Sequence, residues 1–404
     1  AYDQTRAKLA ARYFLDGRDE WAVKWAGEAS ARSGAYVPEA SWTAGLASWR
    51  LRRYNEAAVY FAEAALSQNS SPWMISAGAF WAARSYLVGR QPKNVTFLLD
   101  IAAEHTRTFY GLLAARLLGR PMPFDWTTPD IKQSTLNSLS GLLMGRRALA
   151  LLQVGENRRA EHELRNLSII AGSKLAKGIM LISSRAGMPS LSMRLVEGIY
   201  PDGGAYDVAA YPLPDWKIKD GYSIDRALIY ALVRQESRFN PKAKSGAGAR
   251  GLMQIMPRTA SFVARDNRFR RSKQRDLYKP DINLSLGQKY IDILLNDGKI
   301  KGNMFLMAAA WNGGPGNLSK WRRTVDHLDD SLFFIETLPS RETRIFIERV
   351  FTNLWIYRNR LGQSSPSLDA IAAGRWPLYI AQDGDSMLVA ENGENRRRAG
   401  LPPR

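Results

Sequence analysis

The sequence contains no cysteine and only three histidines among its 404 residues. Without cysteine there can be no disulfide, thiol nucleophile, iron–sulfur cluster or Cys-ligated zinc. The histidines, His105, His162 and His327, lie far apart without metal-ligand spacing, so neither a Ser-His-Asp triad nor a zinc hydrolase is expected. Long apolar runs are also lacking, because none approaches the roughly 18 residues that a transmembrane helix needs. We therefore expect no transmembrane segment and no metal.

Acidic residues are few in relation to basic ones. The chain has 38 Asp and Glu against 57 Lys and Arg, which gives a formal net charge of +19. Such a surplus either serves solubility alone or indicates an anionic partner, such as nucleic acid, a membrane surface or an acidic polymer. With 45% hydrophobic residues the composition is that of a globular protein of two or three domains. The chain begins at Ala1 without a signal-peptide pattern, which fits a mature exported protein or a trimmed fragment.

The first half contains an internal repeat. Similar segments recur every 36 residues, at 11–15, 47–51 and 83–87, and Gly17 and Gly89 can end the helices there. A repeat of this length, with small residues where helices cross, resembles tetratricopeptide-like hairpins that stack into a curved solenoid. We predict such a superhelical domain, acting as a concave binding surface or a spacer. Most of its tryptophans are expected to be core residues: Trp42, Trp49, Trp73 and Trp81.

Proline and glycine mark the domain boundaries. The helical-repeat domain is predicted over residues 1–200, and residues 201–222, with three prolines and three glycines, form the predicted linker. A second domain is predicted over 223–363. Residues 364–404 form a C-terminal extension that ends in an arginine run and two prolines, and it can dock on the solenoid through three side chains: Trp376, Leu378 and Tyr379.

The second domain opens with a strongly apolar helix. Ser223 is its candidate N-cap, and Pro241 forces the helix to end at about Asn240. Glu236 therefore lies in the last turn, where burial and the negative end of the helix dipole both favour a protonated carboxyl group. A carboxylic acid that keeps its proton near neutral pH suits general acid catalysis. The alternative is that Glu236 pairs with a neighbouring arginine on a solvated face.

Three further segments follow in order. Residues 245–257 form a glycine-rich loop that runs into Gly-Leu-Met-Gln-Ile-Met-Pro, residues 309–317 contain Ala-Trp-Asn-Gly-Gly-Pro-Gly, and residues 342–344 read Glu-Thr-Arg. Together with Glu236-Ser237, this order of motifs resembles the soluble lytic transglycosylase family, whose catalytic domain is lysozyme-like. The resemblance covers about residues 220–362 and implies an all-α fold: a helical-repeat solenoid followed by an α-rich catalytic domain of the goose-type lysozyme kind.

The resemblance implies cleavage of the β-1,4 bond between N-acetylmuramic acid and N-acetylglucosamine in peptidoglycan. In the family's pattern Glu236 is the single acid and base, and Ser237 orients that glutamate or the muramyl acetamido group. The remaining sugar-binding positions implied by the motifs are Gly251, Gln254, Met256, Trp311, Asn312 and Glu342. No cofactor is implied. Peptidoglycan strands are the implied partner, with other cell-wall enzymes or envelope complexes as further candidates, and the implied location is the bacterial periplasm.

Counting carboxylates leads to a mechanism. Most glycosidases use two, but here only Glu236 has a suitable setting, with Glu342 as a candidate second, while Asp281 is better explained as a helix start. Our hypothesis is that Glu236 protonates the glycosidic oxygen and then deprotonates the muramyl O6 hydroxyl, which attacks C1. The substrate's acetamido carbonyl or ring oxygen bears the developing positive charge. The product is a 1,6-anhydro sugar.

Two positions depart from the family's pattern, because Trp311 and Phe346 stand where tyrosine is usual. Tryptophan keeps a stacking face but lacks a hydroxyl group. Three alternatives therefore remain: a peptidoglycan or chitin hydrolase on the same scaffold, a non-catalytic glycan-binding scaffold, and a nucleic-acid binder. The last is suggested by charge alone and has no sequence fingerprint, so no nucleic acid partner is expected.

Overall fold

The structure is a computed structural model that describes residues 1–201, 203–218 and 221–383. In this described part every regular element is helical: 21 α-helices and three 3-10 helices, with isolated β-bridges besides. The predicted all-α fold class is therefore confirmed.

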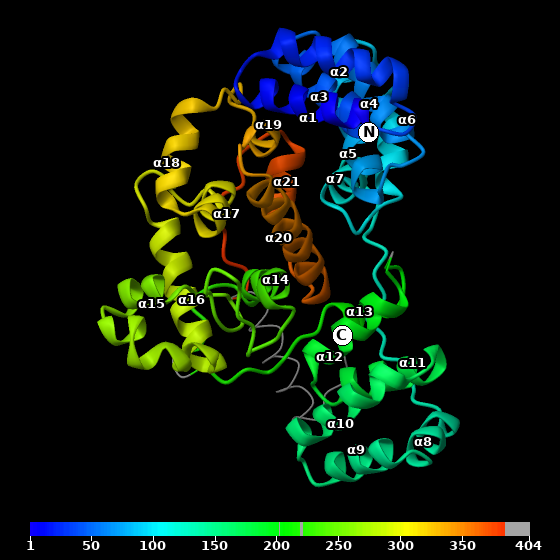
Figure 1. Ribbon diagram of the computed structural model, residues 1–404, viewed down its shortest axis with the longest axis vertical. Coiled ribbons are helices and arrows are strands. Elements are labelled where there is room, and N and C mark those ends of the chain that lie inside the picture. The colour runs from blue at the N-terminus through cyan, green and yellow to red at the C-terminus, as the bar shows by residue number, and fades with distance from the viewer. Residues whose placement is uncertain (202, 219–220, 384–404) are drawn as a thin grey trace, which may run out of the picture. The chain divides into compact units, whose positions relative to one another are not determined.

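The chain divides into two compact units (Figure 1). Unit 1 combines Ala1–Pro123 with Ile291–Arg404, of which residues up to 383 are described, and unit 2 is Phe124–Tyr290. These units follow spatial compactness, whereas the boundaries at 200, 222 and 363 follow sequence pattern and stay a prediction. The helices of unit 1 are α1 (Tyr2–Leu15), α2 (Asp19–Ser33), α3 (Pro38–Arg50), α4 (Tyr54–Leu66), α5 (Pro72–Val88), η1 (Pro92–Asn94), α6 (Val95–Ala103), α7 (Phe109–Leu117), α17 (Met304–Gly313), α18 (Pro315–Thr324), α19 (Ser331–Thr337), α20 (Arg341–Arg360) and α21 (Pro366–Ala372).

The N-terminal helices of unit 1 form the predicted hairpins. The three recurring segments lie at the C-terminal ends of α1, α3 and α5, and each of these helices packs on the helix that follows it. Gly17 adopts the left-handed conformation after α1 (φ 75°), whereas Arg52 and Arg90 fill that role after α3 and α5. The 36-residue repeat is thus one hairpin. Alanines fill the helix crossings because their small side chains allow close approach, and those of α2, for example, are fully buried: Ala22, Ala26 and Ala29.

Aromatic side chains join the repeat to the later helices inside unit 1. Trp49 and Trp81 are buried, as predicted, with their rings edge to face at 5.1 Å, whereas Trp42 and Trp73 are only partly buried. On α7, Phe109 stacks on Trp355 of α20 at a centroid distance of 5.1 Å. The repeat and the C-terminal helices of unit 1 therefore share one core.

The described part of the C-terminal extension packs within unit 1. Helix α21 contacts α7, and Arg116 pairs with Asp369 at 2.5 Å. Beyond it, Met304 N donates to Pro377 O, and the Trp376 ring lies 5.5 Å from that of Phe334. The final arginine run and the two prolines, residues 396–398 and 402–403, lie outside the described residues.

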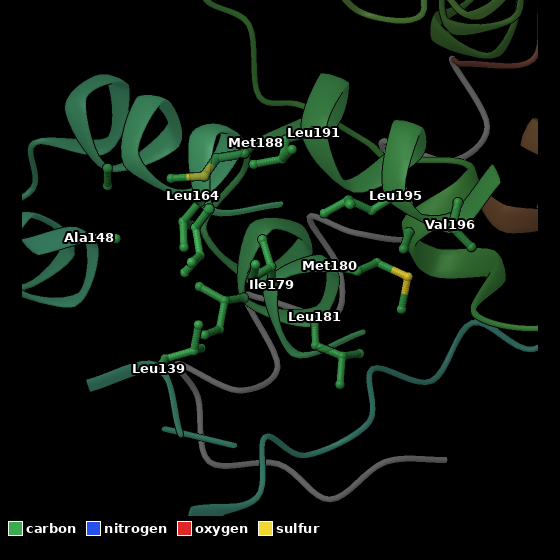
Figure 2. Close-up of a cluster of buried hydrophobic side chains, with 14 residues drawn as sticks. Leu139, Ala148, Leu164, Ile179, Met180, Leu181, Met188, Leu191, Leu195 and Val196 are labelled. Atoms are coloured by element: carbon green, nitrogen blue, oxygen red, sulfur yellow. The ribbon is translucent and has the colours of Figure 1, made fainter. Parts of the chain in front are cut away.

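Unit 2 contains a small helical bundle and the segments around Glu236. The bundle has its own apolar core, to which Leu164, Ile179 and Leu191 contribute fully buried side chains (Figure 2). The predicted linker includes one short helix with a buried Asp207. The helices of unit 2 are α8 (Gln133–Ser140), α9 (Leu143–Gln153), α10 (Asn157–Ile170), α11 (Ser173–Arg185), α12 (Pro189–Ile199), α13 (Asp207–Ala210), α14 (Arg226–Ser237), α15 (Pro257–Ala264), η2 (Asn267–Arg270) and η3 (Ser272–Tyr278), while α16 (Pro280–Leu295) begins in unit 2 and ends in unit 1.

Candidate active site

Helix α14 positions the candidate acid. Its residues from Ala227 to Val233 are buried on every side, so the helix is fixed in the interior of unit 2. The predicted N-cap was wrong, because the helix begins two residues later with Asp225 at the N-cap position. Ser223 lies before it, and its backbone N–H donates to Oε1 of the buried Gln288 at 2.7 Å. A side chain from α16 therefore holds the start of α14.

The end of α14 places Glu236 and Ser237 between core and surface. Both side chains are partly exposed, and the Ser237 hydroxyl donates to Val233 O at 3.2 Å. The helix ends at Ser237, before the predicted position, because Arg238 and Phe239 adopt the left-handed conformation (φ 49° and 61°). Two successive non-glycine residues with positive φ are strained, and such strain concentrates at functional sites.

The strained turn is anchored by packing and by ion pairs. Phe239 is buried and stacks on Trp216 at 5.9 Å. The two arginines that flank Glu236 both pair with Glu197 of α12, Arg234 at 3.6 Å and Arg238 at 3.5 Å. These contacts fix the backbone on both sides of the candidate acid.

The glycine-rich loop of unit 2 is held by its own backbone. Gly251 has φ 78°, and a Cβ atom there would lie 2.1 Å from Leu277 O, so only glycine fits. Gln254 is also left-handed (φ 48°), and its side-chain amide donates to Gly251 O at 2.8 Å and to Ala243 O at 3.2 Å. The amide N–H₂ thus shapes the loop, and Met256 at its end is exposed.

A buried asparagine organises this loop, and our sequence analysis missed it. The Asn283 side chain accepts from Met253 N at 2.8 Å and donates to Arg250 O at 2.9 Å and to Leu277 O at 2.8 Å. An asparagine three residues after a helix-starting proline gives no sequence signal of such a role. Asp281 lies in the first turn of α16, as predicted.

The remaining site candidates lie in unit 1. On α17, Asn312 Oδ1 accepts a hydrogen bond from the buried Thr343 hydroxyl at 2.7 Å, which lies 2.9 Å from Ser340 Oγ. Ser340 also caps α20, accepting from Thr343 N at 3.2 Å. The Asn-Gly and Glu-Thr-Arg segments are therefore brought together through Thr343, a residue that the sequence analysis did not assign.

Close packing explains the glycine next to Asn312. A Cβ atom on Gly313 would lie 2.4 Å from the Trp321 ring, and the neighbouring Gly314 has φ 86°. Trp311 is partly exposed and Glu342 is exposed in the first turn of α20, whereas Phe346 is buried in the core. A tyrosine hydroxyl at position 346 would therefore need a buried partner.

Unit 1 also contains buried carboxyl groups. Glu336 of α19 accepts a hydrogen bond from the buried Tyr110 hydroxyl of α7. Burial raises the pKa of Glu336, and it raises that of Glu348 well above the ordinary value, with Glu336 as a second cause. Burial likewise lowers the pKa of Arg344, the cation near both carboxyl groups. No sequence motif singled out these residues.

Two searches of the described residues bear on other functions. They contain no group of three or more His, Cys, Asp or Glu side chains that could hold a metal ion. No helix in the described ranges is long and apolar enough to cross a bilayer.

A helical repeat, followed by a buried helix that ends on one glutamate and a glycine-rich loop, defines the class of lysozyme-like lytic transglycosylases. Comparison with known proteins supports this class: residues 216–334 match the family model of the transglycosylase SLT domain. The chain therefore contains an SLT domain, and the resemblance noted in the sequence is confirmed.

Curated relatives are similar over the same region. The soluble lytic murein transglycosylases of Salmonella typhimurium and Escherichia coli are 34% and 33% identical over 146 and 156 residues, which make up 35% and 38% of this chain. These alignments cover only 22% and 24% of the two relatives.

Solved structures are similar over more of the chain. The structure of lytic transglycosylase Slt from Pseudomonas aeruginosa matches with a TM-score of 0.69 and 26% identity, covering 88% of this chain and 56% of that one. The 70-kDa soluble lytic transglycosylase of E. coli matches in fold, with a TM-score of 0.63 and 21% identity over 94% of this chain and 64% of that one. The chain thus spans less than two thirds of these proteins.

Proposed function

We propose that this protein is a peptidoglycan lytic transglycosylase of the periplasm, which cleaves the β-1,4 bond between N-acetylmuramic acid and N-acetylglucosamine without consuming water. The match of residues 216–334 to the transglycosylase SLT domain is the observation that supports this function most strongly. Glu236 lies inside that match, at the end of a buried helix and next to a strained turn.

Glu236 acts twice in the proposed reaction. Its carboxyl group first gives a proton to the glycosidic oxygen as the bond from C1 to that oxygen breaks, and the acetamido group or ring oxygen stabilises the positive charge at C1. The resulting carboxylate then takes the proton of the muramyl O6 hydroxyl, whose oxygen forms the new bond to C1. The acid is restored, and all atoms of the substrate appear in the two products.

The supporting groups follow from the site residues. Ser237 is proposed to orient Glu236 or the acetamido group. Gly251 and Gln254 shape the loop that is proposed to contact sugar, with Met256 exposed at its end. Trp311, Asn312 and Glu342 of unit 1 are proposed to complete the sugar site, and Thr343 is proposed to hold Asn312 in place.

The test is mass analysis of the products from purified murein. A lytic transglycosylase releases 1,6-anhydromuramyl ends, whereas a hydrolase releases reducing ends that are heavier by one water. The P. aeruginosa structure is titled as an inactive mutant in which one glutamate is replaced by glutamine. By the same logic Glu236→Gln should abolish product formation here. Reducing-end products would favour a hydrolase, and binding without any product would favour a glycan-binding scaffold.

A further inference from the structure

The positive charge of the chain is concentrated in one stretch of unit 2. Residues 237–279, which follow directly after Glu236, contain twelve Lys and Arg against two Asp, a surplus of ten out of the net +19. These 43 residues are about a tenth of the chain. A surplus that served solubility alone would be spread over the surface, so this concentration indicates a local role.

Part of this charge is neutralised by ion pairs that shape the segment after α15. Arg268 and Lys273 both pair with Asp266, at 2.9 and 3.0 Å. Hydrogen bonds from Arg268 hold the pKa of Asp266 far below its ordinary value, so this carboxylate stays charged. The buried side chains of Phe269 and Leu277 fix the segment to the domain core.

Four arginines of the same segment are left for other partners. Their side chains are exposed, and within the described residues they form neither an ion pair nor a side-chain hydrogen bond. They occupy the end of α15, η2 and η3, where buried Phe269 and Leu277 alternate with outward-facing residues. We call them the arginine patch: Arg265, Arg270, Arg271 and Arg275.

We propose that the arginine patch binds the carboxylate groups of the peptide stems attached to the glycan strand. This inference rests on the proposed function, because peptide stems are the acidic part of peptidoglycan. A guanidinium group is planar and matches a carboxylate with two parallel hydrogen bonds, which favours arginine over lysine for this role. An exposed pair is weak by itself, so the patch discriminates between substrates only when several carboxylates of one polymer bind together.

The experiment compares three full-length proteins on two substrates. The patch variant replaces all four patch arginines with glutamine. The control variant removes the same charge from exposed residues of unit 1, through Lys8→Gln, Arg18→Gln, Arg90→Gln and Lys93→Gln. The substrates are sacculi with free peptide carboxylates and the same sacculi after carbodiimide amidation, and both binding by co-sedimentation and the apparent KM are measured at low and high salt.

We expect the patch variant to bind free-carboxylate sacculi about tenfold more weakly than the wild type, with a matching rise in KM. The control variant should stay within about twofold of the wild type. Amidation or high salt should remove the difference between patch variant and wild type. Equal binding by all three proteins, an equal loss in the control variant, or a patch effect that survives amidation would overturn the proposal. Co-sedimentation needs no turnover, so it tests the patch even if wild-type protein releases no anhydro product and the proposed function fails.

Discussion

Two glutamates of this chain lie at helix ends or in short helices, and they differ in what surrounds them. Glu236 ends α14 of unit 2 with a partly exposed side chain. Glu336 lies in α19 of unit 1, only 6% exposed, and the hydroxyl of Tyr110 donates to it. Burial raises the pKa of Glu336, yet no substrate can reach a carboxyl group that is enclosed in a core. A perturbed carboxyl group alone therefore does not mark a catalytic acid, because access to a substrate is also needed.

The backbone around the two glutamates differs in the same way. Next to Glu236 the chain passes through Arg238 and Phe239 with positive φ, and the glycine-rich loop has another such residue in Gln254. The helix that contains Glu336 is regular and buried throughout. Strain is retained near the candidate site, where the sequence could relieve it with glycine but does not.

The largest expected effect comes from the same substitution made at both glutamates. Glu236→Gln should lower the release of anhydro products by at least 10²- to 10⁴-fold, the usual range for removing one general acid or base, because this group acts twice. Glu336→Gln should leave the rate within about threefold of the wild type, since amide and protonated carboxyl group have the same shape and charge. Initial rates on purified murein, with melting temperatures of both variants, check this.

The opposite pattern would be decisive. If Glu236→Gln keeps most of the activity while Glu336→Gln loses it, the acid has been assigned to the wrong glutamate. If both variants lose activity and also melt early, the assay reports folding and not chemistry.

A second comparison concerns two glycines of the loop beside α14. Gly251→Ala introduces a Cβ atom 2.1 Å from Leu277 O at a position with φ 78°, so we expect destabilisation of about 3 kcal/mol. Gly246→Ala is the matched control, because no atom lies within 4 Å of its Cβ position and its φ is not in the left-handed range. Denaturant unfolding of both variants measures the difference. Equal unfolding free energies would show that the loop adapts.

The sequence predicted elements better than it predicted the contacts between them. The 36-residue repeat was visible because alanine and aromatic residues recur at helical spacing, and Pro241 correctly signalled a nearby helix end. The N-cap at Ser223 was wrong because the group that holds this backbone is Gln288, which is 65 residues away. Long-range polar partners of this kind leave no local pattern.

The same limit applies to the candidate site. Glu236 and the loop glycines were found from motifs, because helix ends and left-handed turns require particular residues. Asn283 and Thr343 were missed, because an asparagine or threonine in a helix becomes important only through the segments that packing brings to it. The pair of Tyr110 and Glu336, separated by 226 positions, could not be inferred from either segment alone.

The buried carboxyl groups of unit 1 predict a pH dependence of stability. Burial raises the pKa of Glu336 and Glu348 above the ordinary 4.5, so above this value the folded chain holds more protons than the unfolded chain. Their contribution to stability is complete below pH 4.5 and is lost as the pH rises through the raised pKa values, by up to about 1.4 kcal/mol per pH unit for each group. Melting temperatures of the wild type and of the double variant Glu336→Gln, Glu348→Gln, measured upward from pH 4.5, check the sign. A difference that does not change with pH would contradict it.

The smallest expected effect isolates the contact that makes Glu336 structural. Tyr110→Phe removes the hydroxyl that donates to Glu336 and leaves the ring packed against Phe109 and Phe80, so we expect a loss of about 1 kcal/mol in unfolding free energy. Tyr36→Phe, at a position 58% exposed, is the control and should change stability by less than about 0.5 kcal/mol. Because neither hydroxyl belongs to the proposed reaction, kcat and KM on murein should stay unchanged in both variants. A fall in kcat for Tyr110→Phe without loss of stability would link the buried pair to the chemistry and remove the distinction between the two glutamates.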